Sequence, residues 1–103
     1  MTAVDRLRQD YLPAFYQYLA RREEPALHRG YELGRTAVAT RVSLLDIASV
    51  HHAALIEVLR QTPAEDLVTT ASAASEFFLD VLAAYDMTQR HYLDGTGTGG
   101  SEL

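Results

Sequence analysis

The side chains in this sequence best suited to metal binding or phosphate transfer are its four histidines, at positions 28, 51, 52 and 91. His51 and His52 are adjacent, and adjacent residues on a helix point about 100° apart, so both cannot hold the same ion. The His-x-x-x-His and Glu-x-x-His spacings of helical metal sites do not occur. The sequence therefore predicts neither a metal site nor a cofactor, and we expect His51 to be a neutral ring in the core.

His52 is the alternative candidate for chemistry, as the phosphoacceptor of a four-helix phosphotransfer bundle. It begins a segment that ends in Thr62-Pro63, superficially like the phosphorylation helix of sensor kinases. In those kinases an acidic residue directly follows the histidine and accepts a proton, whereas Ala53 stands here. The phosphoacceptor function of His52 stays open as the second interpretation.

The absence of two residue types excludes whole classes of catalysis. The chain has no cysteine, which removes disulfides and thiol chemistry, and all nine basic residues are arginine, which removes Schiff-base lysines. A net charge of −5 is unlike the basic surface of a nucleic-acid-binding protein. No run of about 18 apolar residues predicts a membrane span. We expect a cytoplasmic domain that binds no nucleic acid or membrane and is not an enzyme.

Apolar residues between positions 3 and 92 recur with helical spacing, and no segment alternates as a strand would. Ser43 with Asp46 three residues later predicts one helix start, and Thr62-Pro63 predicts another. Pro13 should kink the first helix. The predicted fold is an all-α, four-helix bundle-like domain with a long C-terminal helix. Its helices are expected at residues 3–22, 25–41, 44–60 and 64–93.

The last ten residues differ in composition from the rest of the chain. Residues 94–103 hold four of the six glycines, which is typical of a flexible linker or tail. We therefore divide the chain into a helical domain, residues 1–93, and a Gly-rich segment, residues 94–103, that leads toward a further domain.

The first expected helix is apolar on two adjacent stripes, one more than a surface helix needs. Because two stripes exceed what one core covers, we expect a homodimer. The first stripe supplies the candidate interface residues Tyr11, Phe15 and Tyr18, and the second contains Leu12, Tyr16 and Leu19. On the fourth helix we assign Phe78 to the core stripe, which places Leu79, about 100° further round, at the edge of the buried face.

Several short segments, read in order, resemble the N-terminal domain of the RsbU phosphatases of the bacterial general stress response. The resemblance covers residues 8–92. The segments that carry it include Asp10-Tyr11-Leu12, Leu33-Gly34-Arg35, Asp46-Ile47-Ala48-Ser49-Val50-His51, Thr62-Pro63-Ala64-Glu65-Asp66 and Ala84-Tyr85-Asp86-Met87. The closing Tyr-x-Met and the Ile-x-x-x-His stretch are its most specific parts.

The resemblance implies a regulatory function without catalysis in this part of the chain. Domains of this kind, which are related to a module of the clock protein KaiA, dimerise and precede a metal-dependent serine/threonine phosphatase domain. A switch kinase of the RsbT type binds them and activates the phosphatase, which leads to release of a sigma factor. The family's partner surface corresponds here to Glu24, His28, Leu79 and Ala83.

Overall fold

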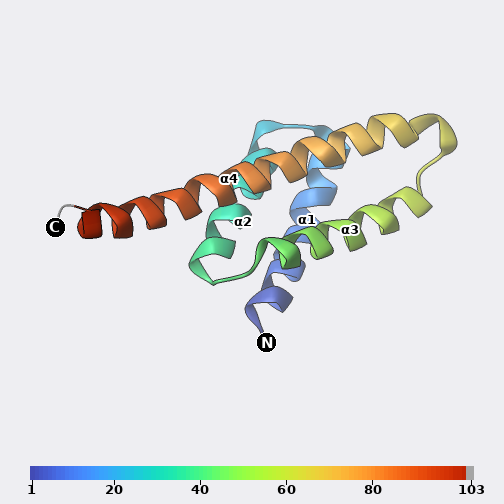
Figure 1. The fold of residues 1–103 in the computed structure, drawn as a ribbon. Helices are drawn as coiled ribbons and strands as arrows, with labels where there is room; N and C mark the ends of the chain where they lie inside the picture. The colour runs from blue at the N-terminus through green and yellow to red at the C-terminus, as the bar shows by residue number, and fades with distance from the viewer. Residues whose placement is uncertain (102–103) are drawn as a thin grey trace.

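The structure, a computed structural model, describes the backbone of residues 1–101 and the side chains of residues 1–93. Over that part of the chain it consists of helices, without a strand (Figure 1). The elements are α1 (Ala3–Arg21), α2 (Glu24–Ala39), α3 (Leu44–Arg60), a short 3₁₀ turn η1 (Ala64–Asp66) and α4 (Leu67–Ser101). The expectation of an all-α domain with a long C-terminal helix is confirmed.

Local hydrogen bonds start α1 and α3. The hydroxyl of Thr2 accepts a hydrogen bond from the Asp5 amide at 3.1 Å, and the Asp5 carboxylate accepts one from the Thr2 amide at 3.2 Å. This reciprocal pair lowers the pKa of Asp5, mainly through the backbone bond from Thr2. Ser43 Oγ accepts from the Asp46 amide at 3.0 Å, so the predicted start of the third helix is confirmed.

The start of the fourth helix differs from the prediction. Thr62 does not cap it; the Thr62 hydroxyl instead donates to the carbonyl oxygen of Val58 at 2.7 Å, at the end of α3. The chain then makes the η1 turn, in which the Asp66 amide donates to the Pro63 carbonyl at 2.9 Å. A threonine hydroxyl is both donor and acceptor, and here the preceding helix end takes the hydrogen bond.

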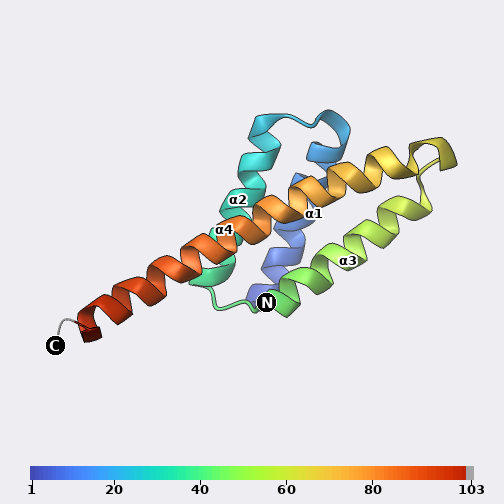
Figure 2. The ribbon, with the colours of Figure 1, turned by 45° about the horizontal axis from the view of Figure 1, so that its top comes forward.

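The far end of α4 lies beyond the expected boundary at residue 93, since the helical backbone continues to Ser101. In both ribbon views α4 runs the length of the molecule, and its C-terminal part extends past the other helices (Figures 1 and 2). The side chains of residues 94–103 lie outside the described part of the chain, and the linker function of this segment stays a prediction.

Helices α2 and α4 pack closely because α2 presents two glycines to α4. A Cβ atom at Gly34 would overlap the carbonyl oxygen of Val81 and lie 2.9 Å from the Ala84 Cβ. A Cβ atom at Gly30 would lie 3.0 Å from the edge of the Phe77 ring. Since any side chain at position 34 would meet backbone, this contact sets how near the two helices lie.

The centre of the core is aromatic and is formed by side chains of α1, α3 and α4. The largest fully buried side chains are Tyr11, Phe15, Ile47, Phe77 and Val81. The Phe77 ring lies edge-on to Tyr11, with 5.3 Å between the ring centroids. Phe77, and not Phe78, is therefore the central aromatic residue of α4. Pro13 lies within α1, which continues to Arg21 and is not split there.

Residues 64–93 are long and apolar enough, on length and composition alone, to cross a membrane. The core helix of a globular domain passes the same test. Phe77, Val81 and Ala84 of this segment are completely buried against the other helices. Only 28% of the most apolar stretch of this segment is buried, so these residues account for a minor part of its apolar character.

Candidate functional site

The residues expected to bind a partner lie exposed on two helices that pack against each other. Glu24 and His28 occupy the first turns of α2, and Leu79 and Ala83 lie one turn apart on α4. Leu79 has 63% of its surface exposed, which is high for a leucine in the middle of a long helix. We call these four residues the partner surface.

Asp80 shows that the α2 and α4 halves of the partner surface are close together. Burial raises the pKa of Asp80, the Glu24 carboxylate raises it further, and His28 lowers it. Charges act in this way only over short distances, so Glu24 and His28 lie near Asp80, the residue next to Leu79. Asp80 was missed in the sequence because nothing local distinguishes it from the other acids of α4.

Leu79 lies further from the core than the sequence suggested. The buried stripe of α4 is centred on Phe77, and Leu79 is two residues and about 200° further round. Leu79 is therefore on the outer side of α4, and the prediction that it borders the buried face is wrong. Its side chain is accessible to another protein without any rearrangement of the core.

His28 is fixed on the surface of α2 by contacts within that helix. Its Nε2 lies 3.6 Å from a carboxylate oxygen of Glu32, and its ring stacks on Tyr31, with ring planes 9° apart. The side chain of His28 is nevertheless 68% exposed. An imidazole held flat in this way offers a partner both an aromatic face and a hydrogen-bonding edge.

A family model described as "Phosphoserine phosphatase RsbU, N-terminal domain" matches residues 9–88 of the chain. The chain belongs to the RsbU N-terminal domain family. The match includes all four residues of the partner surface and most of α1 to α4. Neither a curated protein nor a solved structure matches the chain. Membership implies a regulatory N-terminal domain of a phosphatase in the stress-response pathway.

The residues expected at a dimer interface lie in the core of this RsbU N-terminal domain, and not on its surface. Tyr11 and Phe15 are completely buried in the core of the single chain, and Tyr18 is 7% exposed. The Tyr18 hydroxyl donates to the Glu76 carboxylate at 3.0 Å. These side chains cannot also contact a second copy unless the core opens, so this choice of interface residues was wrong.

The second apolar stripe of α1 faces outward, beside α3. Leu12 and Leu19 are half-buried, and Tyr16 is 45% exposed. A hollow of about 240 Å³ lies between Tyr16 and Ala53 of α3. A second hollow of about 340 Å³ continues from Tyr16 toward Val58. The outer side of α1 and α3 therefore has an open apolar groove, which we call the α1–α3 groove.

His51 of this RsbU N-terminal domain is buried in the aromatic core, in agreement with the sequence. Its ring stacks on Phe78, with 4.0 Å between the ring centroids, and its Nδ1 lies 2.6 Å from the Tyr11 hydroxyl. Burial, with a smaller contribution from His52, lowers the pKa of His51 to about 4. With the ring neutral and its proton on Nε2, the Tyr11 hydroxyl donates to Nδ1.

The remaining candidates for chemistry do not assemble into a site. Among the described residues, no three His, Asp or Glu side chains are grouped so that they could hold a metal ion. His52 is exposed on α3. Its phosphoacceptor function stays an untested alternative, which a phosphotransfer assay on the variant His52→Gln would decide.

Proposed function

We propose that this domain is a non-catalytic regulatory module that dimerises and docks a partner protein, and so controls a tethered phosphatase or other signalling domain. The 63% exposure of Leu79, in the middle of α4, supports this proposal most directly. Together with Ala83, which is exposed one turn further along α4, it offers an apolar contact surface to a partner. Family membership supports a place in a stress-response pathway, and the proposal adds that this pathway acts on a sigma factor in the bacterial cytoplasm.

The partner proposed for this surface is a switch kinase of the RsbT type or a protein that takes its place. Leu79 and Ala83 offer a small apolar ridge on the outer side of α4, and Asp80 and Glu24 place negative charge on the side toward α2. A partner that fits this surface has an apolar groove with arginine or lysine at its edge. His28 then lies at the rim, where it contributes more to selectivity than to affinity.

Dimerisation is proposed through the α1–α3 groove, because Leu12, Tyr16 and Leu19 leave apolar surface uncovered there. The partner surface, on α2 and α4, uses none of the residues that line this groove. A dimer formed in this way presents two copies of the partner surface to the output domains, one from each chain.

The direct test is titration of the chain with a purified RsbT-type kinase in a calorimeter. The proposal predicts one kinase bound per chain and an apparent affinity that weakens as salt is raised, because acidic and basic groups meet at the rim. Absence of binding at kinase concentrations of about 100 μM would remove the proposed partner class.

A further inference from the structure

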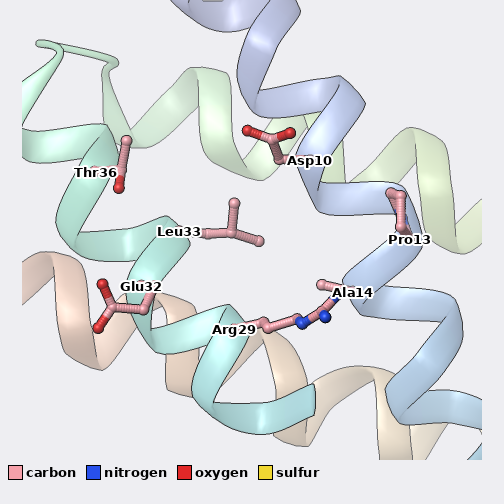
Figure 3. A pocket seen from close by; sticks show the side chains of 7 residues that line it. All are labelled: Asp10, Pro13, Ala14, Arg29, Glu32, Leu33 and Thr36. Carbon is pink, nitrogen blue, oxygen red and sulfur yellow. The ribbon is translucent and has the colours of Figure 1, made fainter. Parts of the chain in front are cut away.

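A hollow between α1 and α2 is separate from the partner surface and from the α1–α3 groove. It has a volume of about 440 Å³, within the range of small-molecule sites. Leu33 points into it from α2, and Arg29 extends across toward Ala14 on α1 (Figure 3). Its apolar lining comes from Pro13, Ala14 and Leu33, and its polar lining from Asp10, Arg29, Glu32 and Thr36.

Two opposite charges in this hollow have no partner among the side chains that the structure describes. Neither the Asp10 carboxylate nor the Arg29 guanidinium forms an ion pair or hydrogen bond with any side chain of residues 1–93. Glu32, by contrast, is engaged by Arg35 and His28, each at 3.6 Å, and its carboxylate points away from Asp10 (Figure 3). Asp10 and Arg29 stand on different helices and form no ion pair with each other.

The two walls of the hollow differ in charge. The α1 wall offers an acceptor, the Asp10 carboxylate, beside Pro13, whereas the α2 wall offers the donors of the Arg29 guanidinium.

We propose that this hollow binds a small zwitterion with an apolar body, of the chemical class of an amino acid. Its ammonium group would lie against Asp10, its carboxylate against Arg29, and its hydrocarbon part on Leu33. A simple anion would meet the charges of Asp10 and Glu32, and a simple amine would meet Arg29. Only a molecule that carries both charges satisfies both walls.

The bound zwitterion would connect α1 to the helix that carries half of the partner surface, because Arg29 directly follows His28. This inference does not depend on the proposed partner, and it is tested with the chain alone. Asp10 and Arg29 are exposed and form no ion pair or hydrogen bond with the described side chains, so variants at these positions should fold normally.

The test is NMR titration of the chain with matched ligands, read from the backbone amides of Ala14 and Leu33. L-Leucine and 6-aminohexanoate supply both charges at two separations. 3-Methylbutylamine and 4-methylpentanoate are leucine without its carboxylate and without its ammonium group. At least one zwitterion should bind about tenfold more tightly than either single-charge analogue.

Two variants and a control connect that preference to the hollow. Asp10→Asn should weaken binding of the zwitterion about tenfold and leave binding of 4-methylpentanoate unchanged or tighter. Arg29→Gln should likewise weaken binding of the zwitterion, and it should leave binding of 3-methylbutylamine unchanged or tighter. Arg60→Gln, an exposed arginine of α3 outside the hollow, should change nothing. Equal binding of zwitterions and single-charge analogues, or preference unchanged in both variants, would overturn the proposal, as would absence of any shift at about 10 mM ligand.

Discussion

The Tyr11 hydroxyl and the Nδ1 atom of His51 lie 2.6 Å apart and connect α1 to α3 inside the core. Burial raises the pKa of Tyr11 well above its usual range, so the phenol stays protonated and remains a donor. Because the pKa of His51 is lowered to about 4, its ring stays neutral and remains an acceptor. Burial thus holds each member in the protonation state that the hydrogen bond requires.

Loss of this hydrogen bond should destabilise the domain. Tyr11→Phe leaves the buried Nδ1 of His51 without its donor, and we expect the free energy of unfolding to fall by about 1–3 kcal/mol. Tyr31→Phe is the matched control, because the Tyr31 hydroxyl has no hydrogen bond to the described residues, and it should change stability by less than about 0.5 kcal/mol. Urea unfolding followed by circular dichroism measures both; equal effects of the two variants would contradict the assignment.

The lowered pKa of His51 predicts a loss of stability in mild acid. The unfolded chain binds a proton at His51 near pH 6.5, whereas the folded chain does so only near pH 4. The contribution of His51 to the free energy of unfolding is therefore fully present above pH 6.5 and is lost as pH falls toward 4. Between pH 6.5 and 5 the free energy of unfolding should fall by about 1.5 kcal/mol.

The control for this pH effect uses the neighbouring histidine. The variant His51→Gln should lose that part of the pH dependence, whereas the variant of exposed His52, His52→Gln, should keep it. Unfolding curves at several pH values give the slope of the free energy of unfolding against pH for the wild type and for each variant. If His51→Gln keeps the wild-type slope, groups other than His51 cause the pH dependence.

The two glycines of α2 should respond differently to a methyl group. Gly34→Ala places its Cβ against the backbone carbonyl of Val81, which cannot move aside, and should cost about 1–3 kcal/mol. Gly30→Ala meets the edge of the Phe77 ring at 3.0 Å. Because alanine also favours the helix by about 1 kcal/mol over glycine, Gly30→Ala should be near neutral. Thermal unfolding distinguishes them, and equal melting temperatures would mean that α2 and α4 can separate.

The proposed dimer should dissociate when charge enters the α1–α3 groove. Tyr16→Glu introduces a carboxylate among Leu12, Leu19 and Ala53, which a second copy could cover only at a large desolvation cost. The chain should then elute at the monomer mass in light scattering. Leu45→Glu is the control, since Leu45 is 75% exposed at the start of α3 and outside the groove. A wild-type chain that is itself monomeric at tens of micromolar would contradict the dimer.

Sequence reasoning succeeded where the controlling interactions are local. The cap formed by Ser43 and Asp46 involves atoms three residues apart, so the pattern determines the geometry. Thr62 shows the limit, because its hydroxyl can serve the helix behind it as well as the one ahead. The choice between donating to Val58 and capping α4 depends on how the chain turns between the two helices.

Which face of each helix is buried could not be predicted from the sequence, for a different reason. The stripe of Tyr11, Phe15 and Tyr18 and that of Leu12, Tyr16 and Leu19 are both apolar and helically spaced, and only packing decides which is buried. The adjacent Phe77 and Phe78 present the same ambiguity. Because the buried stripe was centred on Phe78 and not on Phe77, Leu79 was predicted about 100° too close to the core. Gly34 could have been recognised, since Gly30 and Gly34 stand one turn apart on one helix face.

The measurement that tests the partner surface most directly is the affinity of an RsbT-type kinase for Leu79→Arg, compared with Val68→Arg. Both replace an exposed residue of α4, 63% and 82% exposed, so both should leave stability within about 0.5 kcal/mol of the wild type. Leu79→Arg should lose at least about tenfold in affinity, because an arginine buried in the interface would lack a counter-charge, whereas Val68→Arg should bind like the wild type. Equal affinities of the two variants for the kinase would contradict a partner surface centred on Leu79.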